Sequence, residues 1–478
     1  MKSDTFKRFL LFEEQENFLD IEYKGFEIWE FARGYIYIEI EMIYNKLQPL
    51  FSKQKKDLKR QKSSFSSVLK KLKIFFLKDT DYIFLNNPRR VKQSDGKYYC
   101  IYTDLMIDLL KEKNKCVTFE DPYWYLNPTS NVSHFEPIKT ENICYLDYIE
   151  RLYRIKKYFS KRKNKELHNI LLNIKEKIEK EFKCDLTNIF KLVEDRILYM
   201  LYTYNFYRRL MVRAKPKAVF EFYDIFPSKI VINKIAKELN VPIIEIQHGI
   251  VTKKNPIFLK YGNMDRDYEC LPDYVLSYGK KLLNLEYMPI KKENIFYIGS
   301  LFLNKKLNEY KKEKINKKYI LFVSQSNLGQ YLSTCASELA ELLKSNDEYQ
   351  IIYKMHPYEI GANYECLNKK NITVINDRNK DLYYYQSISC AQIGVYSTGL
   401  YEGLNFGLNT FILSNCFGFN EVKDIIKESQ SVFYVKNAKE IYNIIKEKKL
   451  EKNIENNYWE KVDYNKIVKI INKITCRH

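Results

Sequence analysis

The pattern of hydrophobic and polar positions changes character along the chain. The first 75 or so residues mix aromatic and charged side chains, and a helix is expected after Gly25-Phe-Glu-Ile-Trp29. Residues 145–213 place apolar side chains at intervals of three and four with almost no Gly or Pro, which predicts helices. From Lys217 onward, short apolar runs alternate with amphipathic stretches, which predicts strands alternating with helices.

Two series of strands are expected. The first comprises 81–85, 218–223, 241–246, 273–277 and 294–299, and the second comprises 319–323, 350–355, 372–375, 392–396, 410–413 and 432–435. A strand, a short helix and a strand within about 30 residues form a βαβ unit, which requires a parallel pair of strands. The pattern therefore predicts an α/β protein with two Rossmann-like domains.

Domain boundaries follow from the same pattern. The Lys/Asn-rich stretch 303–318 is interpreted as a linker. It would separate an N-terminal domain, residues 1–302 with a helical insert at about 145–213, from a C-terminal domain at 319–437. The remaining residues, 438–478, are expected to form a helical tail that packs back across the domains. A chain of 478 residues is also too long for one ordinary core.

Composition narrows the class of protein. Ten cysteines occur without a CxxC pair or a Cys/His cluster, which argues against a zinc site and a disulfide framework and favours a reducing, cytoplasmic compartment. No apolar run approaches the roughly 18 to 20 residues that span a bilayer, and the N-terminus does not resemble a signal peptide.

The net charge of +20 is concentrated in two segments. Residues 53–73 carry nine Lys/Arg against Asp57 alone, and residues 151–165 carry eight with no acid. Both interleave apolar residues at near-helical spacing, as a basic amphipathic helix on an anionic membrane surface would. A solvated Lys-rich face explains the same pattern. Nucleic-acid binding is not expected, because the basic residues lie away from the strand-end motifs described next.

Polar residues follow two strands of the first series. Asp224 and His248 come just after strands joined by one short helix, so both should lie at one edge of the sheet. A carboxylate that orients an imidazole makes a general base near neutral pH. Gly249 permits a tight backbone beside a substrate. Glu221 and Glu245 are acids within strands that otherwise look buried, where an ionised carboxylate needs a partner.

The second series has its own strand-end motifs. His356-Pro357 follows one strand, with Lys354 two residues earlier on the same face, and could contact a phosphate. Ser397-Thr398-Gly399 follows another strand and opens a helix, where hydroxyls and free N–H groups could hold an anion. Glu402, one turn later, could accept hydrogen bonds from a ribose or sugar hydroxyl. The loop 324–327 is polar and could line the same cleft. Neither GxGxxG after a strand nor GxxxxGK[ST] occurs.

In order and spacing, these motifs resemble a known family. The Gln247-His-Gly turn, Asp273-Tyr-Val-Leu-Ser-Tyr-Gly, Ile298-Gly-Ser, the His-Pro turn and Ser-Thr-Gly-x-x-Glu look like GT-B-fold glycosyltransferases over residues 215–415. More narrowly, they are similar to those of bacterial capsule and lipopolysaccharide assembly. The His-Pro and Ser/Thr motifs are shared with bacterial sialyltransferases and polyol-phosphate transferases, but the paired-acid-Gly motif of sialyltransferases is missing.

The resemblance implies a nucleotide-sugar donor in the C-terminal domain and a glycan or lipid-linked acceptor in the N-terminal domain, with no resident cofactor or metal. The donor would be CMP- or UDP-linked. Donor contacts are expected from Lys354, His356, Ser397, Thr398, Gly399, Glu402, Ser324 and Ser326. Acceptor contacts are expected from Arg89, Arg90, Gln247 and Gly249, and catalysis from His248, Asp224 and Glu221.

The resemblance also implies a metal-independent, inverting transfer of a sugar in bacterial surface polysaccharide assembly, in the cytoplasm, with peripheral binding at the inner face of the cell membrane as an open option. Three alternatives stay open. Two are enzymes of the same fold, a polyol-phosphate transferase and a sugar-nucleotide epimerase. The third is a basic nucleic-acid-binding protein.

Overall fold

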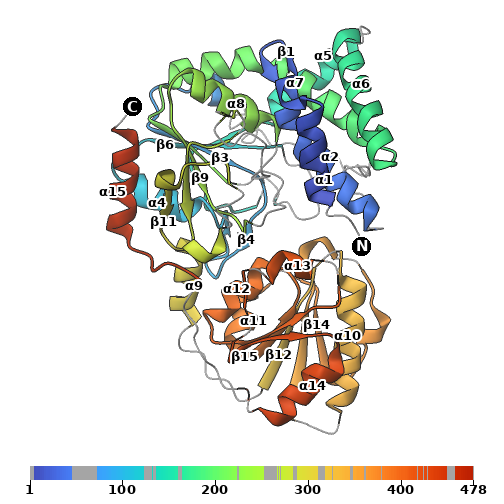
Figure 1. Cartoon of the computed structure of the whole chain (residues 1–478). Helices are drawn as coiled ribbons and strands as arrows, with labels where there is room; N and C mark the ends of the chain where they lie inside the picture. The colour runs from blue at the N-terminus through green and yellow to red at the C-terminus, as the bar shows by residue number, and fades with distance from the viewer. Residues whose placement is uncertain are drawn as a thin grey trace.

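Two parallel β-sheets form the framework of the chain in the computed structural model (Figure 1). Apart from the side chains of residues 73, 358 and 421, the structure describes residues 5–45, 73–122, 132, 136–159, 164–222, 226–251, 266, 268–269, 271–283, 288–310, 318–325, 327–344, 348–359, 362–377, 379–416, 418–423, 425–427, 429–448, 450 and 458–476.

The first sheet has seven strands in the order β11-β10-β9-β8-β3-β6-β7, all parallel. Its strands are β3 (Tyr82–Asn86), β6 (Cys116–Glu120), β7 (Ile143–Tyr145), β8 (Ala218–Glu221), β9 (Ile243–Ile246), β10 (Tyr274–Ser277) and β11 (Ile295–Tyr297). The first strand of this sheet along the chain, β3, lies inside the sheet. Strands β6 and β7 then extend the sheet on one side, and β8, β9, β10 and β11 extend it on the other. That order places a switch point beside β3, where open α/β sheets bind ligands.

The second sheet has six strands in the order β14-β13-β12-β15-β16-β17, again all parallel. Its strands are β12 (Lys318–Val323), β13 (Tyr349–Lys354), β14 (Ile372–Ile375), β15 (Ser389–Gly394), β16 (Asn409–Leu413) and β17 (Val432–Val435). The helices between them are α10 (Gly329–Leu342), α11 (Leu382–Ile388), α12 (Thr398–Leu404) and α13 (Phe419–Val422). The predicted α/β fold with two Rossmann-like domains is confirmed.

Every strand expected from the hydrophobic pattern is present, with ends shifted by a few residues. Strands β6 and β7 were not predicted. Helix α9 (Leu301–Tyr310) occupies the first part of the segment interpreted as a linker.

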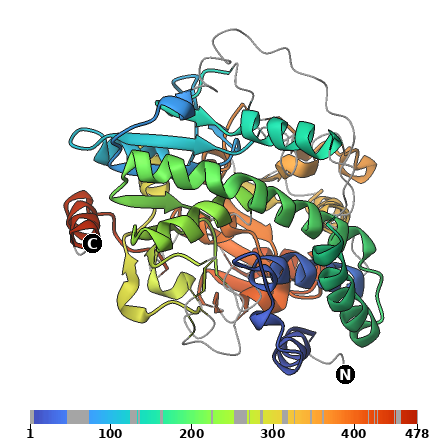
Figure 2. The ribbon, with the colours of Figure 1, turned by 90° about the horizontal axis from the view of Figure 1, so that it is seen from above.

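The helices expected over residues 145–213 are present as α5 (Asp147–Phe159), α6 (Lys165–Phe182) and α7 (Thr187–Ala214). Seen from above, the long green α7 crosses the N-terminal half of the molecule (Figure 2). It packs against α8 (Pro227–Glu238), the helix between β8 and β9. Of the two basic segments, residues 53–72 and 160–163 lie outside the described residues.

The N-terminal helices α1 (Thr5–Gln15) and α2 (Ile28–Tyr44) share the apolar core of this helical layer and are joined to each other by a buried ion pair. Arg33 donates to both carboxylate oxygens of Glu13 at 2.6 and 2.7 Å, and the Trp29 indole N–H donates to Glu13 at 2.6 Å. Both charged side chains are 1% exposed. Trp29 and Arg33 therefore hold α1 against α2.

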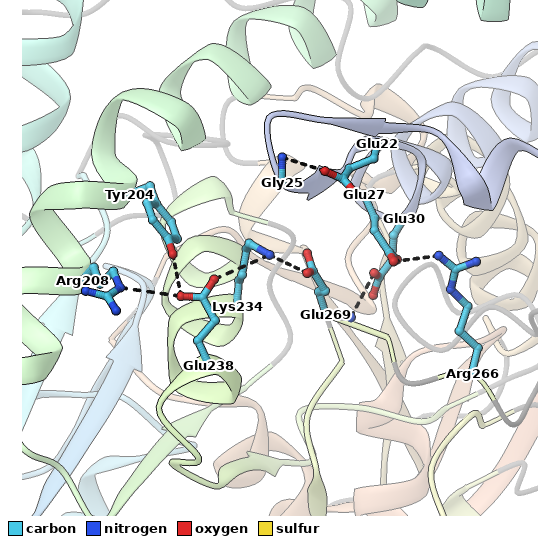
Figure 3. A network of polar contacts seen from close by, with 10 residues as sticks. All are labelled: Glu22, Gly25, Glu27, Glu30, Tyr204, Arg208, Lys234, Glu238, Arg266 and Glu269. Atoms are coloured by element: carbon cyan, nitrogen blue, oxygen red, sulfur yellow. Dashed lines mark hydrogen bonds and ion pairs between the residues drawn. The ribbon is translucent and has the colours of Figure 1, made fainter.

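A hairpin of β1 (Glu22–Tyr23) and β2 (Phe26–Glu27) links α1 to the sheet domain through surface charges (Figure 3). Arg266, in the connection from β9 to β10, donates to Asp20 at 2.8 Å and to Glu27 at 2.7 Å. The backbone N–H of Glu269 donates to Glu30 at 3.0 Å, and Glu269 also pairs with Lys234 of α8.

The C-terminal segment returns to the first domain. Helix α14 (Ala438–Glu447) covers the second sheet, whereas α15 (Tyr464–Thr475) lies beside the first (Figure 1). Residues 458–460, which precede α15, pack closely against the first domain. A Cβ at Gly279 would lie 2.0 Å from the Tyr458 carbonyl oxygen. At Gly299, which has φ of +74°, a Cβ would lie 2.3 Å from the Glu460 oxygen. Glycine is required at both positions.

The remaining described elements are short: α4 (Asp104–Leu110), a hairpin of β4 (Val91–Lys92) and β5 (Tyr98–Tyr99), and several single turns of 3-10 helix. All nine cysteines that the structure describes are free thiols. Within the described part of the chain, no helix is long and apolar enough to cross a membrane.

Candidate functional site

The turn after β3, Asn87-Pro-Arg89, places a cation at the switch point of the first sheet. The Asn87 side chain accepts the Arg89 backbone N–H at 3.1 Å, which fixes the turn, and the Arg89 side chain is exposed. Its charge acts on histidines of both domains, since it contributes to lowering the pKa of His248 and of His356. One guanidinium therefore lies near the strand-end motifs of both halves.

A cluster of ionisable groups is buried at the carboxyl ends of β8 and β9. Glu221 and Glu245 occupy the same register in these neighbouring parallel strands. Asn233 of α8 donates to both oxygens of Glu221 at 3.1 Å. Burial, reinforced by the negative charge of Glu221, raises the pKa of Glu245 well above its ordinary value, while the Lys229 cation opposes that rise. Burial therefore favours the neutral form of the Glu245 carboxyl group over its carboxylate.

His248 follows this cluster by two residues beyond β9. Its Nδ1 lies 3.9 Å from Glu245 Oε1, and its ring meets Tyr102 edge-on at 6.4 Å between centroids. Burial, with smaller contributions from the charges of Arg89 and Lys229, lowers the pKa of His248 well below its ordinary value. The imidazole is thus neutral at physiological pH and can accept a proton.

Gln247 shapes the turn that carries His248. Its side chain N–H groups donate to the carbonyls of Gly249 at 2.6 Å and Leu282 at 3.1 Å. Its oxygen accepts from the Ser277 hydroxyl at 2.8 Å and the Tyr278 N–H at 2.7 Å. All of its hydrogen-bonding capacity is used within the protein, so in this conformation Gln247 positions the turn.

The His356-Pro357 turn is organised by Glu359. This buried carboxylate accepts the His356 N–H at 2.7 Å, the Ser324 hydroxyl at 3.0 Å and the Tyr364 hydroxyl at 2.8 Å. A Cβ at Gly329 would lie 2.0 Å from both Glu359 Oε1 and the Tyr364 oxygen, so the glycine makes this arrangement possible. Burial, together with the charge of Arg89, lowers the pKa of His356 to about 4. His356 is therefore also neutral.

The Ser397-Thr398 turn is held from behind by buried amides. Gln386 donates to the Gly399 carbonyl at 2.6 Å, and Gln392 donates to the Leu400 carbonyl at 2.6 Å. The Ser397 hydroxyl accepts the Gly399 N–H at 3.2 Å and caps α12. Ser397 and Thr398 are themselves partly exposed, which leaves this turn accessible from the side opposite the amides.

Glu402, one turn into α12, has an unusual protonation state. Burial raises the pKa of Glu402 to about 7, with a further rise from the charge of Asp381 and an opposing hydrogen bond from the Tyr383 hydroxyl at 3.0 Å. The group is divided between acid and carboxylate at neutral pH. It can therefore donate or accept a hydrogen bond.

The motifs of the two domains meet. A Cβ at Gly249 would lie 3.3 Å from Thr398 Oγ1, so the turn after β9 lies directly against the turn after β15. With Arg89 acting on His248 and His356, the structure brings together residues from four strand ends of two domains. We call this region the interdomain site.

Other predicted residues lie apart or outside it. Arg90 is fully buried and paired with Glu120, whereas Arg89 is exposed. Lys354 donates to the Asp377 carbonyl at 2.7 Å, toward the edge strand β14. The Ser324 hydroxyl is bound to Glu359, as described above. Asp224 and Ser326 lie outside the described residues.

Some participants were not among the predicted site residues. Glu359 had a local signal, since an acid three residues after the start of a turn can reach back to cap it, as in a capping box. Glu245 was noted as a buried acid, but its approach to His248 depends on the turn. Lys229 and Tyr383 gave no signal, because each reaches the site from a helix. Among the described residues, no group of three or more His, Cys, Asp or Glu side chains could hold a metal ion.

Comparison with known proteins finds likeness in fold only. No family model matches the chain, and no curated protein matches it. Among solved structures it is similar to the UDP-GlcNAc 2-epimerase from Methanocaldococcus jannaschii, at 11% identity over 82% of this chain and 99% of that one, with a TM-score of 0.49.

Two further solved structures have comparable scores. The UDP-GlcNAc 2-epimerase from Neisseria meningitidis, bound to UDP-GlcNAc, is 14% identical over 82% of this chain and 100% of its own, with a TM-score of 0.47. The spinosyn rhamnosyltransferase SpnG, complexed with thymidine diphosphate, is 8% identical over 83% and 96%, with a TM-score of 0.44. These neighbours are GT-B-like epimerases and glycosyltransferases. At such low identity they give no basis for assigning a substrate or a reaction to this chain.

Proposed function

We propose that the chain is a glycosyltransferase that moves a sugar from a nucleotide-activated donor to a hydroxyl of a glycan or lipid-linked acceptor, in the assembly of a bacterial surface polysaccharide. The observation that carries the proposal is the convergence of Arg89, His248 and Gly249 with His356 and Thr398. A cation, two neutral imidazoles and exposed hydroxyls in one interdomain site suit a phosphorylated donor and a base-assisted transfer.

Each group has a role in this reaction. The imidazole N–H of His356 and the hydroxyls of Ser397 and Thr398 donate to the donor phosphates, and Glu402 accepts a hydrogen bond from a ribose or sugar hydroxyl. His248 removes the proton as the acceptor oxygen bonds to the anomeric carbon and the bond from that carbon to phosphate oxygen breaks. Arg89 stabilises the negative charge that the departing nucleotide acquires.

The proposed binding of a nucleotide donor is tested by thermal shift with CMP, CDP, UDP and GDP. A ligand that binds only the folded protein raises the melting temperature. We expect one nucleotide to stabilise the chain. His356→Ala and Thr398→Ala should each weaken its binding by about tenfold or more, the usual loss for a hydrogen bond to a charged group. His168→Ala on α6 and Thr373→Ala on β14, both exposed, are the matched controls.

The proposed role of His248 as general base is tested by measuring nucleotide release in the presence of an acceptor. His248→Ala should retain nucleotide binding and lower kcat by a factor of about 10² to 10⁴, the usual contribution of a general base. The proposal fails if no nucleotide stabilises the chain. It also fails if His248→Ala and His356→Ala are both as active as the parent protein.

A sugar-nucleotide epimerase is the second candidate, favoured by the approach of His248 to Glu245. Epimerisation at a carbon needs one group to remove a proton and another to return one, and the His248 Nδ1 lies 3.9 Å from Glu245 Oε1, a carboxyl group whose pKa is raised by burial. Incubation of each nucleotide sugar in D₂O without acceptor separates the two reactions. An epimerase incorporates solvent deuterium into the sugar, whereas a transferase breaks no carbon–hydrogen bond and leaves the sugar unlabelled with or without an acceptor.

A further inference from the structure

Helix α5 exposes an apolar stripe. Tyr148, Leu152, Ile155 and Phe159 recur at spacings of four, three and four, so they share one face of the helix. Tyr148 is 37% exposed, Ile155 is 55% and Phe159 is 76%, and Tyr158 beside the stripe is 82% exposed. Isolated exposed apolar residues are ordinary, but a contiguous set on one helix marks an interaction surface.

The orientation of α5 is fixed by its opposite face. Ile149 and Tyr153 are buried against the body of the protein. The Tyr153 hydroxyl donates to the Asp195 carboxylate of α7 at 2.7 Å, and Lys157 pairs with the same carboxylate. These contacts hold the buried face of α5 against α7. A rotation of the helix that buried the stripe would break them.

A second element extends the stripe. The turn η2 (Lys73–Phe76) lies next to the start of α5, where the ring of Phe75 meets Tyr148 edge-on at 5.7 Å. The next side chain, Phe76, is 78% exposed. Both elements belong to the N-terminal domain, and Figure 1 shows α5 at the end of the molecule opposite the second sheet.

Basic side chains border the apolar ones. Besides Lys157, which pairs with Asp195, helix α5 carries the exposed cations Arg151, Lys156 and Arg154, of which Arg154 pairs with Glu150, and its two acids, Asp147 and Glu150, are buried. Solvent therefore meets aromatic and aliphatic side chains with cations beside them. The long stems of Lys and Arg allow the charge to lie at headgroup level while the apolar groups lie deeper.

We propose that the stripe of α5 together with Phe76 is a membrane-binding surface specific for anionic lipid. Apolar side chains would enter the interface between headgroups and acyl chains, and the bordering cations would contact anionic headgroups. A nucleic acid matches the cations but offers no place for Ile155. The surface lies away from the interdomain site, so its role is independent of the proposed function.

Vesicle flotation of the full chain tests the proposal. We expect binding to vesicles of phosphatidylcholine mixed with phosphatidylglycerol, much weaker binding to phosphatidylcholine alone, and a decrease with salt. The variant Ile155→Ser/Tyr158→Ser/Phe159→Ser should reduce binding by about tenfold or more, because membrane affinity scales with the apolar area that inserts. Arg151→Gln/Lys156→Gln should reduce binding to the anionic vesicles only.

The matched control is Leu11→Ser/Tyr464→Ser, which removes side chains that are 59% and 49% exposed on α1 and α15. It should bind vesicles as the parent protein does. Equal binding by the triple variant, or no binding by the parent protein, overturns the proposal. So does a dimer that the triple variant converts to monomer without any vesicle binding, because the surface then serves self-association. Nucleotide-induced thermal shift should be unchanged in the triple variant, which separates this test from that of the proposed function.

Discussion

At the scale of single residues, the interdomain site depends on groups whose charge is suppressed. For both His248 and His356, burial is the larger cause of the lowered pKa, and the positive charge of Arg89 lowers the pKa further. We predict that Arg89→Met raises the pKa of His248 and of His356 toward the ordinary value without reaching it. Because the chain has only five histidines, NMR titration of the imidazole signals can follow each one. Arg208→Met, an exposed cation on α7, should leave both unchanged, and an unshifted pair in Arg89→Met would contradict the shared position of this guanidinium.

Glu402 carries a second residue-scale prediction. Its pKa of about 7 lies above the value in an unfolded chain, so the contribution of this group to stability is complete below about pH 4.5 and is lost as the pH rises through 7. Glu402→Gln should remove this dependence and stabilise the protein at pH 8 by about 1 to 3 kcal/mol, since one pKa unit corresponds to about 1.4 kcal/mol. Urea unfolding at pH 5 and pH 8 measures the effect, with Glu447→Gln on α14 as control. An unchanged pH dependence would show that the carboxyl group is ionised in the folded protein.

The positions of the site residues could be predicted from the sequence better than their contacts. The strand-end positions of His248, His356 and Ser397 follow from the parallel topology and were predictable. Their contacts were only partly predictable. Arg89 was expected to contact the acceptor and Glu359 had a capping signal, but the geometry of the turns that bring them to the histidines is not encoded by any periodicity. Arg89 and Arg90 are adjacent in sequence with opposite environments, one exposed and one buried against Glu120. Only the fold distinguishes them.

At the scale of elements, the strands that escaped prediction have a physical reason. Strand β6 reads Cys-Val-Thr-Phe-Glu, with alternating polar residues that suggest one solvated face. Both faces are buried, since Thr118 and Glu120 are each 1% exposed and Glu120 is neutralised by Arg90. Strand β7 has only three residues, which is too short for a period to be visible. Longer strands with a continuous apolar run, such as residues 319–323 of β12, were predicted because burial on both faces needs no partner from elsewhere.

The docking of α1 on α2 gives an element-scale prediction. Glu13→Gln leaves Arg33 buried without a counter-charge, and breaking a buried ion pair in this way costs about 3 to 5 kcal/mol. Urea unfolding should show that loss. The double variant Glu13→Leu/Arg33→Met removes both charges and should recover most of the stability, since apolar residues of similar volume can replace a buried pair. If the double variant is as unstable as Glu13→Gln, packing of the Trp29 N–H and not charge governs this contact.

At the scale of the whole molecule, the two domains meet at the turns that carry the proposed chemistry. With Gly249 and Thr398 this close, a bound nucleotide and acceptor must lie beside the contact, and their entry requires the domains to separate.

The position of Thr398 Oγ1, 3.3 Å from a Cβ built at Gly249, is close to that of a sulfur bonded across a disulfide. We therefore predict that Gly249→Cys/Thr398→Cys forms a disulfide on oxidation, which shows as loss of two free thiols and a shift on non-reducing gels. The oxidised protein should bind nucleotide more slowly than its own reduced form, and reductant should restore the rate. The single variants serve as controls for the substitutions themselves. A bond that fails to form would place the two turns farther apart in solution, and a bond that forms without slowing nucleotide entry would mean that the donor reaches its site without domain separation.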